Sequence, residues 1–186
     1  MGYGIKLGGG GTSKGVIFKD LDASGNPTSI FINLPGVTIP NNRWKVSSGA
    51  NAFLSPEIKY ASQLKLICES IGDSALENCW TPKYESKFKV DCTSIGSRAF
   101  YGGGGESRKI WLSKKVQSCG DLAFHTSRMY LYTTQMDLKM YCESPSKPTG
   151  YADGWNQYSY VDASHTASYP ERATYWGVSE ASFDAL

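Results

Sequence analysis

The residues of this chain that could carry out catalysis are few. There are only two histidines, His125 and His165. A Ser-His-Asp site could be drawn around His165 with Ser164 or Asp162, but neighbours along a chain do not have the geometry of a triad. No nucleophile-elbow motif occurs, and no spacing among the acidic residues marks a pair of carboxylates suited to glycoside hydrolysis. We therefore expect a protein that is not an enzyme.

Two stretches look at first like loops that bind a cation or a phosphate. Residues 20–28 begin like an EF-hand loop, but the twelfth position is Phe31 instead of the bidentate Glu that calcium requires, and no helical pattern flanks it. We interpret this stretch as a hairpin turn rich in Asp, Gly and Asn. The glycine run 8–11 lacks the Gly-Lys-[Ser/Thr] order of a phosphate loop. No cofactor and no metal are expected.

The cysteines have the spacing of a core and not of a metal site. There are five of them and no Cys-x-x-Cys pair, so a structural zinc site is not expected. Cys68, Cys92 and Val116 follow one another at equal intervals along the chain. A position that accepts Cys, Cys and Val is typical of a small buried apolar column. We predict reduced cysteines in the core.

The same interval separates copies of the motif Gly-x-x-Ala-[Leu/Phe], whose glycines stand at positions 72, 96 and 120. A fixed period in this range is the signature of a solenoid. The glycine allows a close backbone approach, the alanine fits between stacked coils, and the Phe or Leu fills the core. Three copies are clear, and a degenerate fourth precedes them at Gly49. The motif residues are Gly49, Ala52 and Phe53; Ile71, Gly72 and Ala75; Ile95, Gly96, Ala99 and Phe100; and Gly120, Ala123 and Phe124.

Short alternating runs between these turns predict the strands. Stacked one per repeat, they would form a parallel ladder with a spacing of about 4.8 Å. The runs are 64–67, 88–90, 110–112, 129–132 and 138–142. Two earlier runs, 16–18 and 29–32, flank the turn-rich stretch and predict a β-hairpin that leads into the solenoid. We expect a mainly β chain with an N-terminal β segment over 1–36, a solenoid of about four repeats over 37–145, and a C-terminal cap over 146–186.

Composition narrows the possible partners. Charged residues make up 19% of the chain and the net charge is +2, without the basic excess of a nucleic-acid surface. No apolar run is long enough to span a membrane, so membrane insertion is not expected. The first residues lack the pattern of a signal peptide. We therefore expect the chain to stay in the compartment where it is made, or to leave it as part of an assembly.

The motif combination Val-Thr-Ile-Pro at 37–40 and Ile-Gly-x-x-Ala-Phe at 95–100 resembles the BspA-like (Treponema-type) leucine-rich repeat family. The resemblance covers about residues 37–142, and the tail around Trp155 and Trp176 is similar to the C-terminal cap of many members. Ser113 and the glycines 102–105 depart from the family pattern. The resemblance implies a curved solenoid used for adhesion or other protein contacts. Short versions with an opening like residues 20–28 are similar to proteins of Firmicutes phages and prophages.

These expectations combine into one functional hypothesis. The chain would be a non-enzymatic phage virion protein, attached to other virion proteins through its N-terminal segment and forming a homo-oligomer or part of a larger assembly. Its solenoid would serve host-surface adhesion, to a glycan or a protein, or decoration of the capsid or tail. The alternative is an adhesion or protein-binding module of a bacterial cell surface. Aromatic side chains anchor such contacts, and the candidate contact residues are Tyr151, Tyr158, Tyr160 and Tyr169. Trp155 and Trp176 are expected to close the open end of the solenoid.

Overall fold

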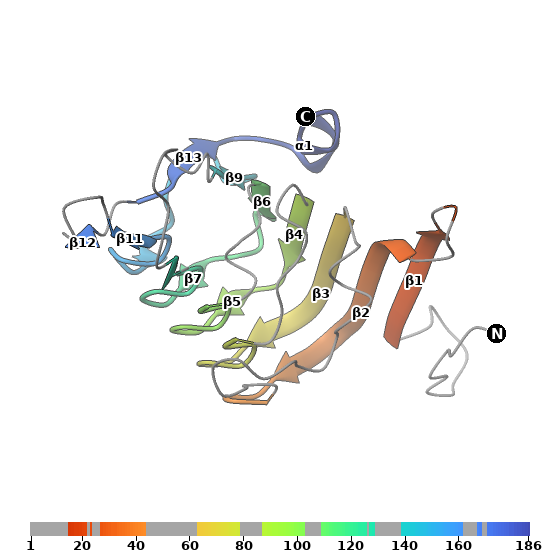
Figure 1. Cartoon of the computed structure of the whole chain (residues 1–186), viewed down its shortest axis with the longest axis horizontal. Coiled ribbons are helices and arrows are strands. Elements are labelled where there is room, and N and C mark those ends of the chain that lie inside the picture. The colour runs from red at the N-terminus through yellow and green to blue at the C-terminus, as the bar shows by residue number, and fades with distance from the viewer. Residues whose placement is uncertain are drawn as a thin grey trace.

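Figure 1 shows the computed structural model of the chain, which is mainly β and curls around one core. The structure describes the following residues: 15–21, 23, 27–43, 63–78, 87–102, 109–125, 127–128, 139–161, 167–168 and 171–186. Among these residues the only α-helix is α1 (Glu180–Asp184). The mainly β, solenoid-like expectation is therefore confirmed.

The N-terminal end of the described chain is a hairpin. Strand β1 (Gly15–Leu21) pairs antiparallel with β2 (Pro27–Ile39), with Gly15 opposite Asn33. The other side of β2 pairs in parallel with β3 (Gln63–Ile71). Strand β2 is therefore already the first rung of the parallel ladder. The predicted boundary after residue 36 falls inside this strand, so the solenoid begins earlier than expected.

Strand β3 divides the sheet into two arms. Its first half, through Ile67, pairs with β4 (Lys87–Asp91), while its last two residues pair with β5 (Ser94–Ile95). One arm continues from β4 through β6 (Lys109–Leu112) and β9 (Lys139–Cys142) to β13 (Ala173–Trp176). The other arm continues from β5 through β7 (Ser118–Cys119) to β10 (Gly150–Tyr151). The result is a curled parallel sheet in the form of a half-barrel (Figure 1).

The predicted Gly-x-x-Ala-Phe turns form a third side, stacked one on the next. Gly96 donates its N–H to Ile71, and Gly120 donates its N–H to Ile95. The glycines are required because a Cβ built at Gly96 would lie 2.5 Å from the backbone nitrogen of Asp73 in the coil before it. A larger residue there would push the coils apart.

Two positions after each turn glycine, a non-glycine residue takes the left-handed conformation. Ser74, Arg98 and Leu122 have φ values of 52°, 55° and 54°, and Asn42 occupies the same place in the first coil. Such backbone costs about 1–2 kcal/mol for an ordinary residue. The left-handed conformation is stabilised because the backbone N–H of each of these residues donates to a carbonyl of the following coil. The N–H of Ser74, for example, donates to the Ser97 carbonyl at 2.8 Å.

The core lies between the two arms and the stacked turns. Alternate residues of each strand point inward, so every rung adds the same two positions to a continuous apolar column. On four consecutive rungs the fully buried residues are Leu64 and Leu66, Phe88 and Val90, Ile110 and Leu112, and Met140 and Cys142. The packing continues towards the turns. The ring of Phe88 packs edge-on against that of Phe100, which stacks on that of Phe124. The predicted core cysteines are confirmed at positions 68, 92, 119 and 142, which are buried and free, whereas Cys79 lies outside the described residues.

The ladder register bears on two of the predicted rungs. Ile39 pairs with Ile71, so the coil before Gly72 turns at Pro40 and is longer than the predicted repeat. The predicted motif copy at Gly49, Ala52 and Phe53 lies outside the described residues. Strand β6 pairs directly with β9. These two strands are therefore neighbouring rungs of the ladder, and the run 129–132, which was predicted as a rung, lies outside the described residues.

The C-terminal part of the chain completes the ladder on both arms and then crosses its outer side. Strands β8 (Ser127–Arg128), β11 (Ser159–Val161) and β12 (Ala167–Ser168) form a separate three-stranded sheet. After β13 the chain runs to α1, which lies beyond β6 and β4 in Figure 1. In the described part of the chain no helix is long and apolar enough to cross a membrane.

Candidate binding surface on the outer face of the sheet

The outer face of the arm β3–β4–β6–β9 carries a group of lysine side chains on neighbouring strands. Residues that alternate with the core positions point away from the core. In parallel register they form rows that cross the strands. One row runs Lys65, Lys89, Trp111, Tyr141 and Tyr175. The neighbouring row runs Gln63, Lys87, Lys109, Lys139 and Ala173. We call these two rows the lysine face.

Like charges stand next to one another in both rows. Neighbouring parallel strands are about 4.8 Å apart, so Lys87, Lys109 and Lys139 follow one another at this spacing. Like charges directly opposite each other destabilise a sheet. Burial and the charge of Lys109 together lower the pKa of Lys87. The lysine face is thus a surface that requires negative charge beside it.

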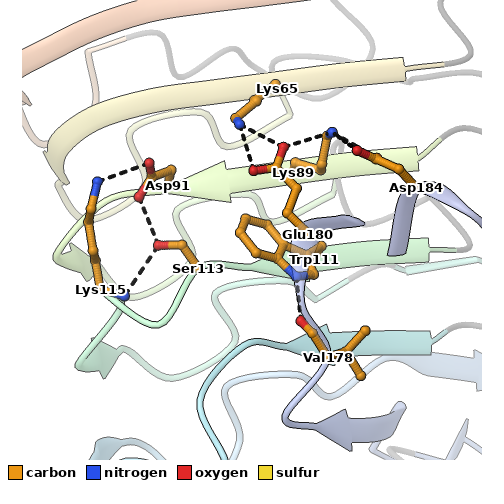
Figure 2. A network of polar contacts seen from close by, with 9 residues as sticks. All are labelled: Lys65, Lys89, Asp91, Trp111, Ser113, Lys115, Val178, Glu180 and Asp184. Atoms are coloured by element: carbon orange, nitrogen blue, oxygen red, sulfur yellow. Dashed lines mark hydrogen bonds and ion pairs between the residues drawn. The ribbon is translucent and has the colours of Figure 1, made fainter. Parts of the chain in front are cut away.

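The C-terminal segment 177–186, which we call the tail, supplies that negative charge. Glu180 accepts hydrogen bonds from Lys65 at 2.6 Å and forms an ion pair with Lys89 at 2.9 Å, and Asp184 binds Lys89 at 2.8 Å (Figure 2). Backbone oxygens of the tail also accept from the face: Lys87 donates to the Asp184 carbonyl at 2.6 Å, and Lys109 donates to a Leu186 oxygen at 2.9 Å. Lysines of both rows therefore contact the tail.

An aromatic contact lies beside these ion pairs. Trp111 donates its indole N–H to the Val178 carbonyl at 2.9 Å (Figure 2). Phe183 is completely buried and packs with Trp111 and Tyr141 in a small cluster that is separate from the main core. Tyr141 in turn stacks on Tyr175 with ring centres 5.2 Å apart. The row that begins at Lys65 therefore offers cations at one end and aromatic rings at the other, while the neighbouring row continues with lysines as far as Lys139.

The ionisation of the central pair is set by the contact itself. Burial alone would lower the pKa of Lys89, but its hydrogen bonds with Asp184 and Glu180 outweigh burial and raise that pKa. Burial alone would raise the pKa of Glu180, and the hydrogen bonds from Lys65 and Lys89 outweigh it, so that this pKa falls below 4.5. Both groups are held in their charged forms at neutral pH.

A second polar network marks the edge of the lysine face. Ser113 donates to Asp91 at 2.8 Å, and Lys115 bonds the other oxygen of the same carboxylate at 3.1 Å (Figure 2). Lys115 is largely exposed. Asp91 ends β4, and Ser113 and Lys115 follow β6, so this network ties adjacent coils together. It is therefore distinct from the lysines that contact the tail.

Two of the four tyrosines predicted to form a contact surface are buried instead. Tyr151 is 5% exposed and Tyr158 is 7% exposed. Tyr151 ends the column Ile39–Ile71–Ile95–Cys119, and its hydroxyl donates to the Val116 carbonyl at 3.3 Å. Its prediction as a contact residue is wrong because this part of the chain continues the ladder and is drawn into the core. Tyr160 lies in β11 next to β12, and Tyr169 lies outside the described residues.

The two tryptophans expected to close the end of the solenoid, Trp155 and Trp176, lie near each other. Trp155 packs edge-on against Phe124, with ring centres 6.2 Å apart, and its ring centre is 6.5 Å from that of Trp176. His125, the one histidine among the described residues, is buried and stacked on Tyr101. Burial and the charges of Arg172 and Arg98 lower the pKa of His125. In the part of the chain that the structure describes, no cluster of His, Cys, Asp or Glu has the arrangement of a metal site.

Sequence reasoning missed the lysine face altogether. A signal was present, because Lys65 and Lys89 occupy the same place in successive repeats and alternate with apolar core positions. The Ser179 side chain caps α1 by accepting from the N–H of Ser182, and Glu180 stands in the first turn, which is a recognisable helix start. What no local pattern reveals is that these two features meet, since Lys65 and Glu180 are separated by 115 residues.

Comparison of the chain with protein-family models, with curated proteins and with solved structures yields no match.

Proposed function

We propose that this chain is a non-enzymatic structural protein of a bacteriophage particle, which attaches by its N-terminal end and carries its solenoid outward for host-surface adhesion or for decoration of the particle. The finer fold assignment belongs to the same proposal. The ladder would be a leucine-rich-repeat solenoid of the BspA-like type, and the cluster of Tyr151, Trp155 and Trp176 would be its aromatic cap. The packing of those three rings at the end of the core supports this assignment.

The observation that carries the proposal is the difference between the two ends of the ladder. Among the described residues, β1 pairs with β2 alone, so this seven-residue strand has one side with no partner strand. A free edge offers a row of backbone N–H and C=O groups to an incoming strand. At the other end of the described ladder, β13 and β10 also pair on one side only, but they have four and two residues and offer a much shorter edge. A partner in the particle would therefore add to the ladder at β1.

The first experiment asks whether the chain is in the particle. Phage particles induced from a strain that carries the coding sequence would be purified on a density gradient, digested, and analysed by mass spectrometry, with immunogold labelling of intact particles. We expect the chain at a stoichiometric level, with label on the outside. Absence from purified particles overturns the proposal. Recovery in the cell-envelope fraction instead would support the alternative, an adhesion module of a bacterial surface.

The second experiment tests the edge. Adjacent residues of an antiparallel strand point their N–H groups to opposite sides, so Ile17→Pro and Phe18→Pro form a matched pair. One removes a bond to β2 and lowers the melting temperature, and the other removes only an N–H on the free side and leaves the fold intact. The variant that keeps its melting temperature is expected to be missing from particles. Normal incorporation of that variant would rule out attachment through β1.

A further inference from the structure

The lysine face is a preformed site that the chain itself occupies. We propose that it binds an acidic peptide segment of a partner protein, and that the tail, residues 177–186, is the built-in competitor for that partner. This inference does not depend on the chain being part of a particle.

Without the tail, the lysine face would present rows of neighbouring positive charges. Lys65 and Lys89 are neighbours in one row, and Lys87, Lys109 and Lys139 are neighbours in the other. Two cations directly opposite each other on neighbouring strands destabilise a sheet. A surface that contacts only water is therefore not expected to carry such pairs. Carboxylates placed between the rows remove this repulsion, as Glu180 does by binding Lys65 and Lys89 at once.

Most side-chain contacts of the tail are ion pairs and hydrogen bonds with lysines, grouped around one buried ring. Helix α1 has five residues, far fewer than a helix needs to be stable by itself. Its carboxylates are partly exposed, so salt screens them. Phe183 is the buried side chain of α1, and its cluster is separate from the main core. The tail can therefore detach while the ladder keeps its own columns.

A hinge lies at the start of the tail. Gly177 has a φ of +74°, and a Cβ built there would meet nothing within 4 Å. It follows directly on the last strand, β13, and precedes Val178, whose N–H bonds to the Cys142 carbonyl at 3.0 Å. Rotation at Gly177 moves the whole of α1 and breaks the bond from Val178 to Cys142, but it leaves the four residue pairs of β13 with β9 in place.

The tail also defines the chemistry of the ligand. It presents two carboxylates, those of Glu180 and Asp184, together with the ring of Phe183, which is directed at Trp111 and Tyr141. An anionic polymer would match the lysines but would leave the aromatic end of the face unfilled. The arrangement therefore favours a peptide that carries acidic residues around an aromatic side chain.

The test uses the full chain and a synthetic peptide with the sequence of residues 177–186, labelled with heavy isotopes so that mass distinguishes it from the tail. In the wild-type protein, excess peptide should displace the tail and raise amide hydrogen exchange in residues 178–186 while exchange in β4 and β6 stays constant. The matched control peptide carries Glu180→Gln and Asp184→Asn and should have no effect. Unchanged tail exchange at saturating peptide would overturn the proposal.

A second measurement uses a full-length variant, Glu180→Gln/Phe183→Ser/Asp184→Asn, whose tail no longer competes. Removing an internal competitor raises the apparent affinity by the factor by which the open state was underpopulated. We expect the labelled peptide to bind this variant at least about tenfold more tightly than it binds the wild-type chain, and the further change Lys89→Gln to weaken that binding about 5- to 30-fold. Equal binding to both chains would refute competition. Stronger binding of a sulfated polysaccharide than of the peptide would refute the peptide as the occupant.

Discussion

The two faces of the same four strands are built by opposite rules. Towards the core, β3, β4, β6 and β9 present apolar residues whose neighbours are the equivalent residues of the next coil. Towards the outside, they present cations whose partners lie in the tail, for example Lys65 with Glu180. The inner face is stabilised by burial, which is proportional to area and is not weakened by electrostatic screening. The outer face is stabilised by charge, which salt and pH control.

This difference teaches that one element can serve stability and recognition at once. Because side chains alternate along a strand, changes on the outer face leave the core columns intact. The ladder can therefore hold a binding surface whose occupant comes and goes. The predictions below test whether the two faces are as independent as their contacts indicate.

The largest effect is expected from the core. Phe100→Ala removes a fully buried ring that contacts Phe88 and Phe124, and should lower the free energy of unfolding by about 3–5 kcal/mol. Urea denaturation followed by circular dichroism measures it. The control is Phe183→Ala, which removes an equally buried ring from the outer face and should cost less than about 2 kcal/mol, because the tail opens separately from the ladder. Equal losses would mean that the two faces unfold as one unit.

The second prediction compares two glycines. Gly96→Ala places a methyl group against backbone atoms of the preceding coil, 2.5 Å from the Asp73 nitrogen, and should cost about 3 kcal/mol in global stability. Gly177→Ala meets no atom and should cost only about 1–2 kcal/mol for its left-handed backbone. We expect that smaller cost to show as faster hydrogen exchange in the tail. Global destabilisation by Gly177→Ala would contradict the role of this residue as a hinge.

The third prediction concerns the ion pairs. Lys89→Gln removes the cation that joins Glu180 and Asp184, and should favour the open tail by about 1–2 kcal/mol, since hydrogen bonds to charged groups carry energies of this size. Hydrogen exchange of residues 178–186 measures the opening. Lys115→Gln is the matched control, because Lys115 is exposed and pairs with Asp91 at the edge of the face. It should change stability by less than about 0.5 kcal/mol and leave tail exchange unaltered.

The smallest effects separate the two regions by pH. The folded pKa of Glu180 is below its ordinary 4.5, so its contribution is complete above pH 4.5 and is lost as pH falls through the folded value. The folded pKa of His125 is below its ordinary 6.5, so the unfolded chain takes up the proton first and stability declines as pH falls from 6.5 towards the folded pKa.

As pH falls below 6.5, resistance to denaturation should therefore weaken, while the tail remains protected from exchange down to pH 4.5. His125→Gln should remove most of that slope, and below pH 4.5 the tail should open in either protein. A tail that opened near pH 6 in the wild-type chain would show that the stacked turns and the lysine face are coupled.

Much of the fold could be predicted because its signals are local and repeated. The glycines at 72, 96 and 120 mark stacked turns, and the runs 64–67, 88–90 and 110–112 coincide with β3, β4 and β6. The first and last coils of the ladder were harder to predict from the sequence. The register joins Ile39 to Ile71 and Cys119 to Tyr151, so the first and last coils are longer than those between them. A motif search with one fixed period does not find them.

The candidate site could not be predicted for a different reason. A tyrosine such as Tyr151 looks the same in sequence whether it faces solvent or ends a core column, and only the register places it. Lys89 and Asp184 are 95 residues apart and meet because the chain returns across the ladder after β13. Charge complementarity between distant segments has no period and therefore leaves no repeated signal.

The buried thiols can report which coil of the ladder opens. Cys68, Cys92, Cys119 and Cys142 belong to successive coils and are shielded from solvent. A thiol reagent can reach each of them only when its own coil separates from a neighbour. The order in which the four sulfurs are modified will therefore reveal whether the stack frays from one end or breaks in the middle, without any label being introduced.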